Sequence, residues 1–111
     1  VLVGSGALLY PALEIGCVGG IVAVGNMAPG PSGELFQAFK AGRSSEAGRL
    51  QQQLGPIHNE IVGAIGVPGV KASLDLLSYR GGDPRPPIRP LPGQGREQVR
   101  EILVRNGLLD G

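Results

Sequence analysis

Gly16-Cys17-Val18-Gly19-Gly20-Ile21-Val22-Ala23-Val24-Gly25-Asn26 is the stretch that decides the fold. Within it, the run from Val18 to Val24 is apolar, largely β-branched and free of charge. Such a run predicts a strand that is buried on both faces, in the middle of a parallel sheet or barrel. Gly19 and Gly20 weaken a strand unless something must come close to the backbone. Two interpretations stay open here, the approach of a ligand and tight packing against a helix.

A second apolar run precedes this stretch. Residues 1–4 predict the end of another buried strand, and residues 7–15 predict a short, mostly covered helix. Gly16 is well placed as the left-handed residue that follows this helix. Strand, helix and strand with short turns form a βαβ unit, so the two strands should be parallel.

The remainder of the chain predicts helices. The first is expected at 33–41, with Ser32 as N-cap, and the second is a longer helix that Ser44 or Ser45 caps and that runs to about Ile65. Helices at 70–79 and 96–106 follow, with a proline-rich connection at 80–95. The second of these helices has an apolar residue at every third or fourth position: Ala47, Leu50, Leu54, Ile57, Ile61 and Ile65. Because this stripe continues in register past Gly55-Pro56, the proline should kink the helix rather than end it.

Two strands are too few for a stable parallel sheet, because each would leave a hydrogen-bonding edge exposed. The chain also begins inside the apolar run Val1-Leu2-Val3. We therefore expect these 111 residues to be a piece of a longer protein that supplies the other strands.

Charge and composition exclude several classes of function. The formal net charge of +1 gives no electrostatic reason to expect a nucleic acid or an anionic membrane as partner. No apolar stretch reaches the roughly 20 residues that a membrane span needs. Cys17 and His58 are the only cysteine and histidine, which excludes a disulfide framework and a Cys/His metal cluster within the chain.

Some short motifs allow a functional and a structural interpretation. Gly4-Ser5-Gly6 resembles the start of a dinucleotide fingerprint but lacks its third glycine, since Leu9 occupies that place. The segment 84–89, Pro-Arg-Pro-Pro-Ile-Arg, fits an SH3 ligand, with a rigid connector as the plainer interpretation. His58 is expected to be structural. Lys71 is either a buried amine with a depressed pKa or a partnered or snorkelling lysine.

Five motifs in a fixed order carry a resemblance to a known family. They are Val1-Leu2-Val3-Gly4-Ser5-Gly6, the run from Leu13 to Asn26, Gln53-Leu54-Gly55-Pro56-Ile57-His58-Asn59, Gly66-Val67-Pro68-Gly69-Val70-Lys71 and Asn106-Gly107-Leu108-Leu109. In this order they resemble the C-terminal part of the dihydrodipicolinate synthase / N-acetylneuraminate lyase family. The spacing from Gly4 to Asn26, together with Tyr79-Arg80-Gly81-Gly82, is most similar to the 4-hydroxy-2-oxoglutarate aldolase branch.

The resemblance implies an α/β fold, the C-terminal fragment of a (β/α)8 TIM barrel. Residues 1–43 would be its last two βα units and residues 44–111 a C-terminal helical extension. In this family a lysine on the sixth strand forms a Schiff base with a 2-oxo acid and a tyrosine on the fifth relays protons. Both would lie upstream of Val1, so no catalytic residue is assigned here, and Lys40 and Lys71 do not take the lysine's role. The resemblance implies neither a cofactor nor a metal.

Substrate-binding positions do carry over from the family. Gly4 resembles the glycine that lines the pyruvate pocket, and Ile21 resembles the residue whose main chain faces the bound 2-oxo acid, while Ser5 is a further candidate for the same wall. Where many synthases carry acidic residues after Ser-Gly, this chain has Ala7-Leu8-Leu9, which favours an aldolase.

The resemblance thus implies part of a class I, Schiff-base lyase or aldolase whose substrate is pyruvate or a related 2-oxo acid, such as 4-hydroxy-2-oxoglutarate aldolase or dihydrodipicolinate synthase. It implies a homo-oligomeric parent, a tetramer in many relatives, in the cytoplasm or a mitochondrion. The isolated fragment should be inactive. The alternative is an inactive truncated chain or a partner-dependent interaction fragment.

Overall fold

A computed structural model describes residues 1–110 of the chain. Its two strands, β1 (Leu2–Val3) and β2 (Gly19–Gly20), pair in parallel, with Val3 opposite Gly20. Backbone bonds from Val18 N to Val1 O (3.0 Å) and from Ile21 N to Val3 O (2.9 Å) extend the ladder at both ends. The predicted βαβ unit with parallel strands is therefore confirmed.

The expectation of a long, doubly buried strand at 18–24 is wrong for this structure. Pairing covers only Gly19 and Gly20, and a 3-10 helix, η2, takes over at Ala23–Asn26. Val18 and Ile21 are 70% and 76% exposed. A ribbon of two strands has no neighbour on its outer side, so these β-branched side chains have nothing to pack against.

The connection between the strands consists of η1 (Gly6–Leu8) and α1 (Leu9–Glu14). Gly16 follows with φ = +105°, as predicted for the residue beyond a helix end. Leu9, Ala12 and Leu13 are buried, but Ile15 is 86% exposed. The expectation of a mostly covered helix therefore holds for one face only.

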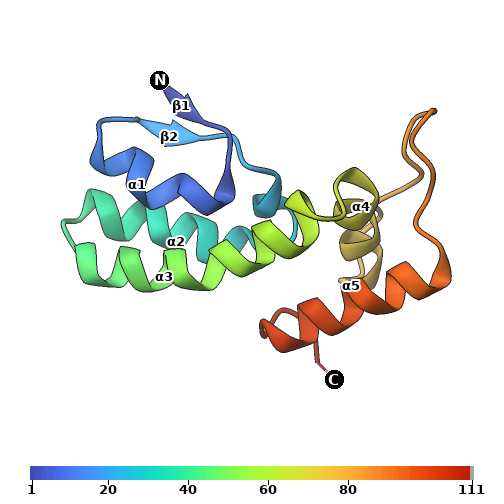
Figure 1. The fold of residues 1–111 in the computed structure, drawn as a ribbon. Coiled ribbons are helices and arrows are strands. Elements are labelled where there is room, and N and C mark those ends of the chain that lie inside the picture. The colour runs from blue at the N-terminus through green and yellow to red at the C-terminus, as the bar shows by residue number, and fades with distance from the viewer. Residues whose placement is uncertain (111) are drawn as a thin grey trace.

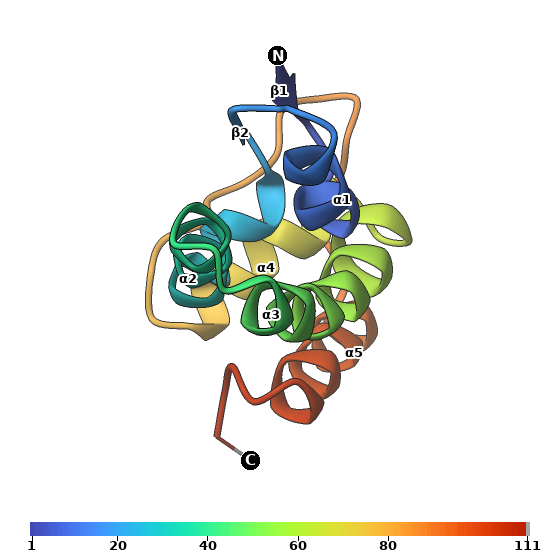
Figure 2. The ribbon, with the colours of Figure 1, turned by 90° about the vertical axis from the view of Figure 1, so that its left-hand side faces the viewer.

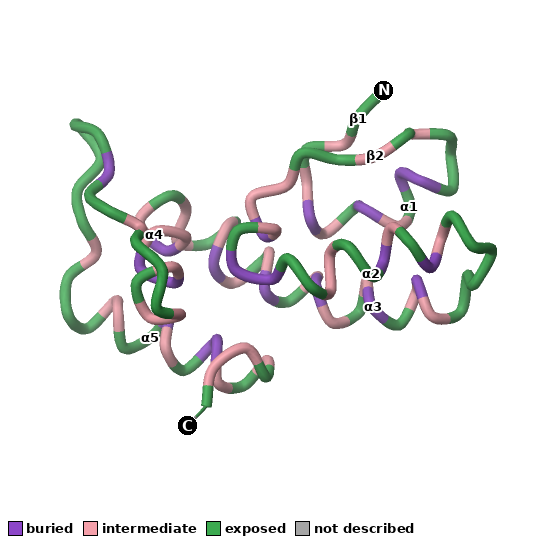
Figure 3. Tube along the Cα trace, turned by 180° about the vertical axis from the view of Figure 1, so that it is seen from behind, coloured by how far each residue is buried: buried purple, intermediate pink, exposed green. Residues whose placement is uncertain are grey.

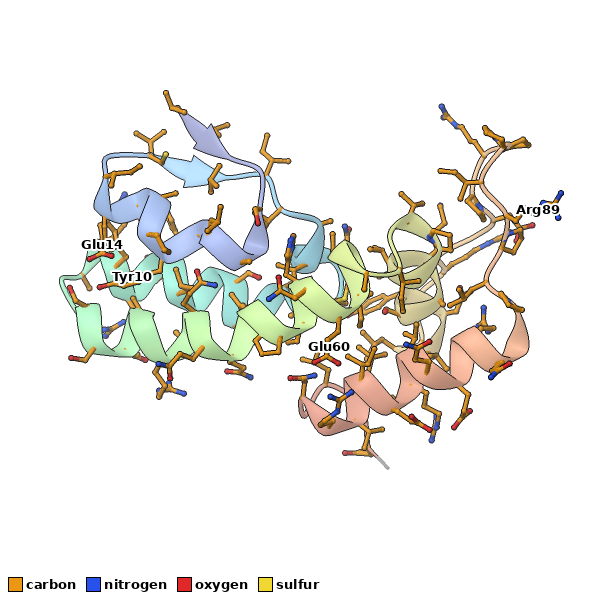
Figure 4. All side chains as sticks on the ribbon, viewed as in Figure 1. Tyr10, Glu14, Glu60 and Arg89 are labelled. Carbon is orange, nitrogen blue, oxygen red and sulfur yellow. The ribbon has the colours of Figure 1, made fainter. Side chains whose placement is uncertain are left out.

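Below this unit lie two long helices, α2 (Pro29–Lys40) and α3 (Ser44–Ile57). Figure 1 and the turned view of Figure 2 show the same order, with the β1–β2 ribbon outermost, α1 next, and α2 and α3 as the following layer. The ring of Tyr10 on α1 meets Phe39 of α2 edge to face, with 6.1 Å between ring centroids. Figure 4 shows Tyr10 between these helices.

The start of α2 differs from the sequence expectation. The helix begins at Pro29, not after Ser32, because proline at the first helical positions lacks only an N–H that would have no intrahelical partner. Ser32 is not an N-cap: inside the first turn, its Oγ donates to Ala28 O at 2.8 Å.

The long helix continues past its proline, as the uninterrupted apolar stripe predicted. Pro56 lies inside α3, and the chain goes on as a π-helix, η3 (His58–Gly63), in place of a simple kink. Its wide turns are seen in bonds from Ala64 N to Asn59 O (3.0 Å) and from Gly66 N to Ile61 O (2.8 Å). π turns of this kind are frequent at functional sites.

Two further helices complete the chain, α4 (Val67–Leu76) and α5 (Gly93–Arg105). Each begins three residues before its predicted start, at 70 and 96. The loop between them folds back onto α4, because Lys71 Nζ donates to Gly81 O (3.0 Å) and Asp75 Oδ1 accepts from Gly81 N (2.8 Å). The predicted proline-rich connection is therefore anchored at its beginning.

The apolar stripe of α3 and η3 lies at the centre of the core. Ala47, Leu54, Ile57 and Ile61 are fully buried, and Leu50 is 2% exposed. Leu50, Leu54, Ile57 and Ile61 share one cluster with residues of η2 and of all five α-helices, so the core crosses the predicted boundary at residue 43. Figure 3 shows buried segments along the helices and none on the β1–β2 ribbon. Among residues 1–110, no helix is long and apolar enough to cross a membrane.

Replacing Leu54 by alanine should lower the free energy of unfolding by about 2–5 kcal/mol, because it removes a fully buried side chain from the centre of this cluster. The same substitution at Leu8, which is 54% exposed, should cost less than about 1 kcal/mol. Urea unfolding followed by circular dichroism measures both variants. Equal losses at the two positions would contradict the assigned core.

Candidate functional site

The carboxyl-terminal end of the β1–β2 ribbon brings the three predicted substrate-binding residues together. Gly4 directly follows Val3, and Ile21 directly follows Gly20, the residue paired with Val3. Ser5 comes next to Gly4 in the chain. Since carboxyl ends of parallel strands meet at one edge, Gly4, Ser5 and Ile21 share that edge, where barrel enzymes place their active sites.

The backbone around Gly4 is open. Apart from Gly4 itself and its two chain neighbours, no heavy atom of residues 1–110 lies within 4 Å of the position that a Cβ at Gly4 would take. Ile21 is exposed, and its N–H is used in the bond to Val3 O. The backbone of Gly4 is therefore accessible and carries no side chain, which suits a pocket for a small ligand.

Gly20 favours the packing interpretation of the two glycines. A Cβ added there would lie 2.9 Å from Val3 Cγ1 and 3.1 Å from Leu9 Cδ1. At Gly19 the nearest atoms, on Leu2 and Phe36, are at 3.5 Å or more. Space at Gly20 is therefore taken by neighbouring side chains of β1 and α1.

Ser5 is the N-cap of η1, and its hydroxyl group has two contacts. Its Oγ accepts from Ala7 N at 3.3 Å, and it lies 3.4 Å from His58 Nε2 at the start of η3. The other ring nitrogen, His58 Nδ1, is buried and has no hydrogen-bond partner among residues 1–110. The predicted structural role of His58 thus includes a contact with a candidate site residue.

Gln51 contacts the segment next to the candidate site, a contact that the sequence did not reveal. From α3, its Nε2 donates to Gly6 O at 3.0 Å and its Oε1 accepts from Tyr10 N at 2.7 Å. It lies 45 and 41 positions from these partners in the chain. No local pattern marks it, because Gln51-Gln52-Gln53 reads as three ordinary helix residues.

An apolar groove runs along the outer face of the ribbon and α1. It has a volume of about 550 Å³ and is lined by Val1, Leu2, Val3, Gly4, Leu8, Pro11, Ala12, Ile15 and Cys17.

Ion pairs of the structure lie away from this groove. In one of them, Arg105 of α5 and Glu60 of η3 are 2.9 Å apart. In Figure 4 Glu60 lies on the α5 side of its helix.

Neither lysine of the chain belongs to this edge. Lys40 ends α2, with Nζ 5.5 Å from the centroid of the Phe36 ring. Lys71 on α4 donates to Gly81 O, which favours the partnered interpretation of this residue. Within residues 1–110, no three His, Cys, Asp or Glu side chains gather in a way that could hold a metal ion.

The proline-rich segment does not form the polyproline helix that an SH3 ligand requires. Ile88 N donates to Arg85 O at 3.1 Å, which closes a turn over the middle of the motif, and Pro84 is buried. Arg89 is exposed beyond this turn and is labelled in Figure 4. The connector interpretation fits this geometry.

The chain is similar to dihydrodipicolinate synthases both in sequence and in structure. The 4-hydroxy-tetrahydrodipicolinate synthase of Methanopyrus kandleri is 32% identical over 108 residues, which are 97% of this chain and 36% of that protein. The crystal structure of dihydrodipicolinate synthase from Thermotoga maritima superposes with a TM-score of 0.88 at 27% identity, over 98% of this chain and 37% of that one.

A ligand complex is also among the similar structures. YagE from Escherichia coli K12, a prophage protein of the dihydrodipicolinic acid synthase family solved with pyruvate, matches with a TM-score of 0.88 at 28% identity. The alignment covers 97% of this chain and 37% of YagE. The chain thus spans about a third of the length of the proteins it matches, and its solved neighbours are TIM-barrel proteins.

The family model for dihydrodipicolinate synthetases matches residues 1–106, nearly the whole chain. Named relatives of this family are lyases. With its parallel ribbon, its helical continuation and this match, the chain belongs to the dihydrodipicolinate synthetase family.

Proposed function

We propose that this chain is the C-terminal part of a class I lyase that acts on pyruvate or a related 2-oxo acid. The observation that carries the proposal is the shared position of Gly4, Ser5 and Ile21 at the carboxyl-terminal edge of the ribbon, in a chain of this family. In a barrel, that edge opens into the active site. The solved complex of YagE with pyruvate, a family member, supports this ligand class.

In this proposal residues 1–43 are the last two βα units of the barrel and residues 44–111 its helical extension. The exposed apolar side chains of the ribbon then have a partner, since preceding strands and helices would cover the groove along Val1, Leu8 and Ile15. The parent would be a homo-oligomer, such as a tetramer, located in the cytoplasm or a mitochondrion.

The chemistry needs an amine that this chain does not place at the edge. A lysine from the preceding part of the protein would attack the ketone carbon of the 2-oxo acid, and water would leave to give an iminium. The iminium accepts the electron pair of the carbon–carbon bond during cleavage, or activates the neighbouring carbon during formation. Gly4, Ser5 and the main chain of Ile21 would form one wall around the bound acid.

Two reactions of this class are candidates. The relatives named 4-hydroxy-tetrahydrodipicolinate synthase favour synthesis of that compound. The apolar Ala7-Leu8-Leu9 after Gly6, where many synthases have acidic residues, favours an aldolase that cleaves 4-hydroxy-2-oxoglutarate. Comparing turnover of the full-length protein in the two assays decides between them.

A second candidate function rests on the exposed apolar ribbon. Val1, Val18 and Ile21 are 93%, 70% and 76% exposed, which favours association with another surface. An inactive, partner-dependent fragment would have this property. A cooperative thermal transition and a folded circular dichroism spectrum of the monomeric 111-residue chain would contradict it.

Borohydride treatment in the presence of pyruvate should add one reduced pyruvyl group to the full-length protein, because reduction makes the carbon–nitrogen bond permanent. Intact-mass spectrometry, with and without pyruvate, measures the adduct. The isolated chain should show neither adduct nor aldolase turnover, since its lysines, Lys40 and Lys71, are engaged elsewhere. Absence of the adduct from the full-length protein, or turnover by the isolated chain, would refute the proposal.

Replacing Gly4 by alanine should raise the KM for pyruvate about tenfold, because the added methyl group would enter the proposed pocket. The melting temperature should not change, since apart from the adjacent residues no heavy atom of residues 1–110 lies within 4 Å of the new Cβ. Gly55→Ala is a matched control on α3, where a Cβ also meets nothing within 4 Å. Equal KM values for Gly4→Ala and wild type would exclude Gly4 from the substrate wall.

A further inference from the structure

Two side chains of the long helix reach the turn that carries the proposed substrate wall. Gln51 in α3 and His58 at the start of η3 are seven positions apart, two turns of an α-helix, and so lie on one face. That face contacts Ser5, Gly6 and Tyr10. The contacts join residues more than 40 positions apart, so no local preference of the turn creates them.

Gln51 uses both ends of its amide. It donates to Gly6 O and accepts from Tyr10 N, at 3.0 Å and 2.7 Å. Tyr10 N lies in the first turn of α1, where backbone N–H groups have no intrahelical acceptor. One side chain therefore satisfies a carbonyl before α1 and an amide within its first turn, which fixes the position of both.

His58 holds the neighbouring residue through its ring. Nδ1 is buried without a partner, and a buried N–H without an acceptor is costly, so we assign the ring proton to Nε2. Nε2 then donates to Ser5 Oγ at 3.4 Å. Ser5 Oγ also accepts from Ala7 N, which leaves its own hydrogen for another acceptor. A carboxylate or hydroxyl oxygen of a 2-oxo acid would be such an acceptor.

The turn is held partly by packing, since Gly6 is buried and a Cβ there would collide with Val24 and lie 3.4 Å from His58 Nδ1. At Gly4 only the adjacent residues lie within 4 Å of the Cβ position, and glycine leaves the backbone wide conformational freedom there. A pocket wall placed about 1 Å away from its proper position is enough to weaken binding of a small substrate. The two helix side chains therefore add polar contacts to the packing of Gly6, and these contacts fix the position of the proposed wall more closely.

We infer that Gln51 and His58 are positioning residues of the lyase, which hold the Gly4–Ser5–Gly6 turn in place and orient the Ser5 hydroxyl toward the bound 2-oxo acid. The inference rests on the proposed function and goes beyond it, because it assigns a substrate-binding contribution to the helical extension. Neither residue touches the substrate itself.

The first test replaces Gln51 in the full-length protein. Gln51→Met removes both hydrogen bonds at similar size and helix propensity, and should raise the KM for pyruvate about 3- to 10-fold with a smaller change in kcat. Gln51→Glu keeps the acceptor for Tyr10 N but places an oxygen against Gly6 O, so it should not restore the KM. Gln52→Met is the matched control, since Gln52 is exposed on the same helix.

The second test is a double-mutant cycle between Ser5→Ala and His58→Met. If His58 acts through the Ser5 hydroxyl, each single variant should raise the KM about 3- to 10-fold and the double variant no further. His58→Gln restores a donor and should recover part of the loss. Effects that add would mean that His58 acts only through packing and would overturn its assigned role.

A readout independent of turnover accompanies both tests. Amide hydrogen exchange at Tyr10 should speed up in Gln51→Met and stay unchanged in Gln52→Met, because only the first variant loses the bond to Tyr10 N. Should the Gln51 variants fail to fold, the cycle between Ser5 and His58 still decides the role of the helix. Unchanged exchange and unchanged KM in folded Gln51→Met would overturn the inference.

Failure of the inference and failure of the proposed function are distinguishable. If wild-type protein forms no borohydride-trapped pyruvyl adduct, the lyase proposal fails, and the substrate role of the two residues fails with it. If wild type forms the adduct while Gln51→Met and His58→Met keep the wild-type KM, only the positioning role fails.

Discussion

Burial of one apolar stripe on α3 and η3 is the constraint on which the rest of the structure depends. Leu54, Ile57 and Ile61 are fully buried at the centre of a cluster that includes residues from η2 and all five α-helices. The β ribbon cannot take this role, because two short strands bury little surface. A helix placed at residues 44–57 and prolonged through a π turn therefore supports the βαβ unit from below.

The same helix joins the core to the candidate site. Its apolar face fixes its position against α1, α2 and α5, while Gln51 and His58 extend that fixed position to the turn after β1. A packed interior changes shape little, so a side chain anchored in it transmits a well-defined position. In the proposed lyase, a segment outside the barrel strands would thus help to position the proposed substrate wall.

The ribbon shows where the local preference of a sequence and its surroundings diverge. The run 18–24 has the composition of a buried strand, yet only Gly19 and Gly20 pair, and Ile21 is exposed. β-branched residues favour strands because they pack against neighbours on both sides. Among residues 1–110 the strand has one partner strand and one covering helix, so the apolar pattern of 18–24 is typical of a full sheet rather than of this two-stranded ribbon.

Sequence alone determined the βαβ order, the parallel pairing and the continuous helix through Pro56, because apolar periodicity and glycine position are local properties that can be followed along the chain. The family was indicated separately, by the resemblance of five motifs in a fixed order. The same resemblance also pointed to Gly4, Ser5 and Ile21. Only the tertiary structure decided how far the strand at 18–24 extends, that α2 begins at Pro29, and that Gln51 and His58 meet the turn. The extent of the strand and the contacts of Gln51 and His58 depend on residues far apart in the chain, and hydrogen bonds across 41 to 53 positions leave no periodic trace in a sequence. The start of α2 at Pro29 has a local cause, the tolerance of proline at the first helical positions.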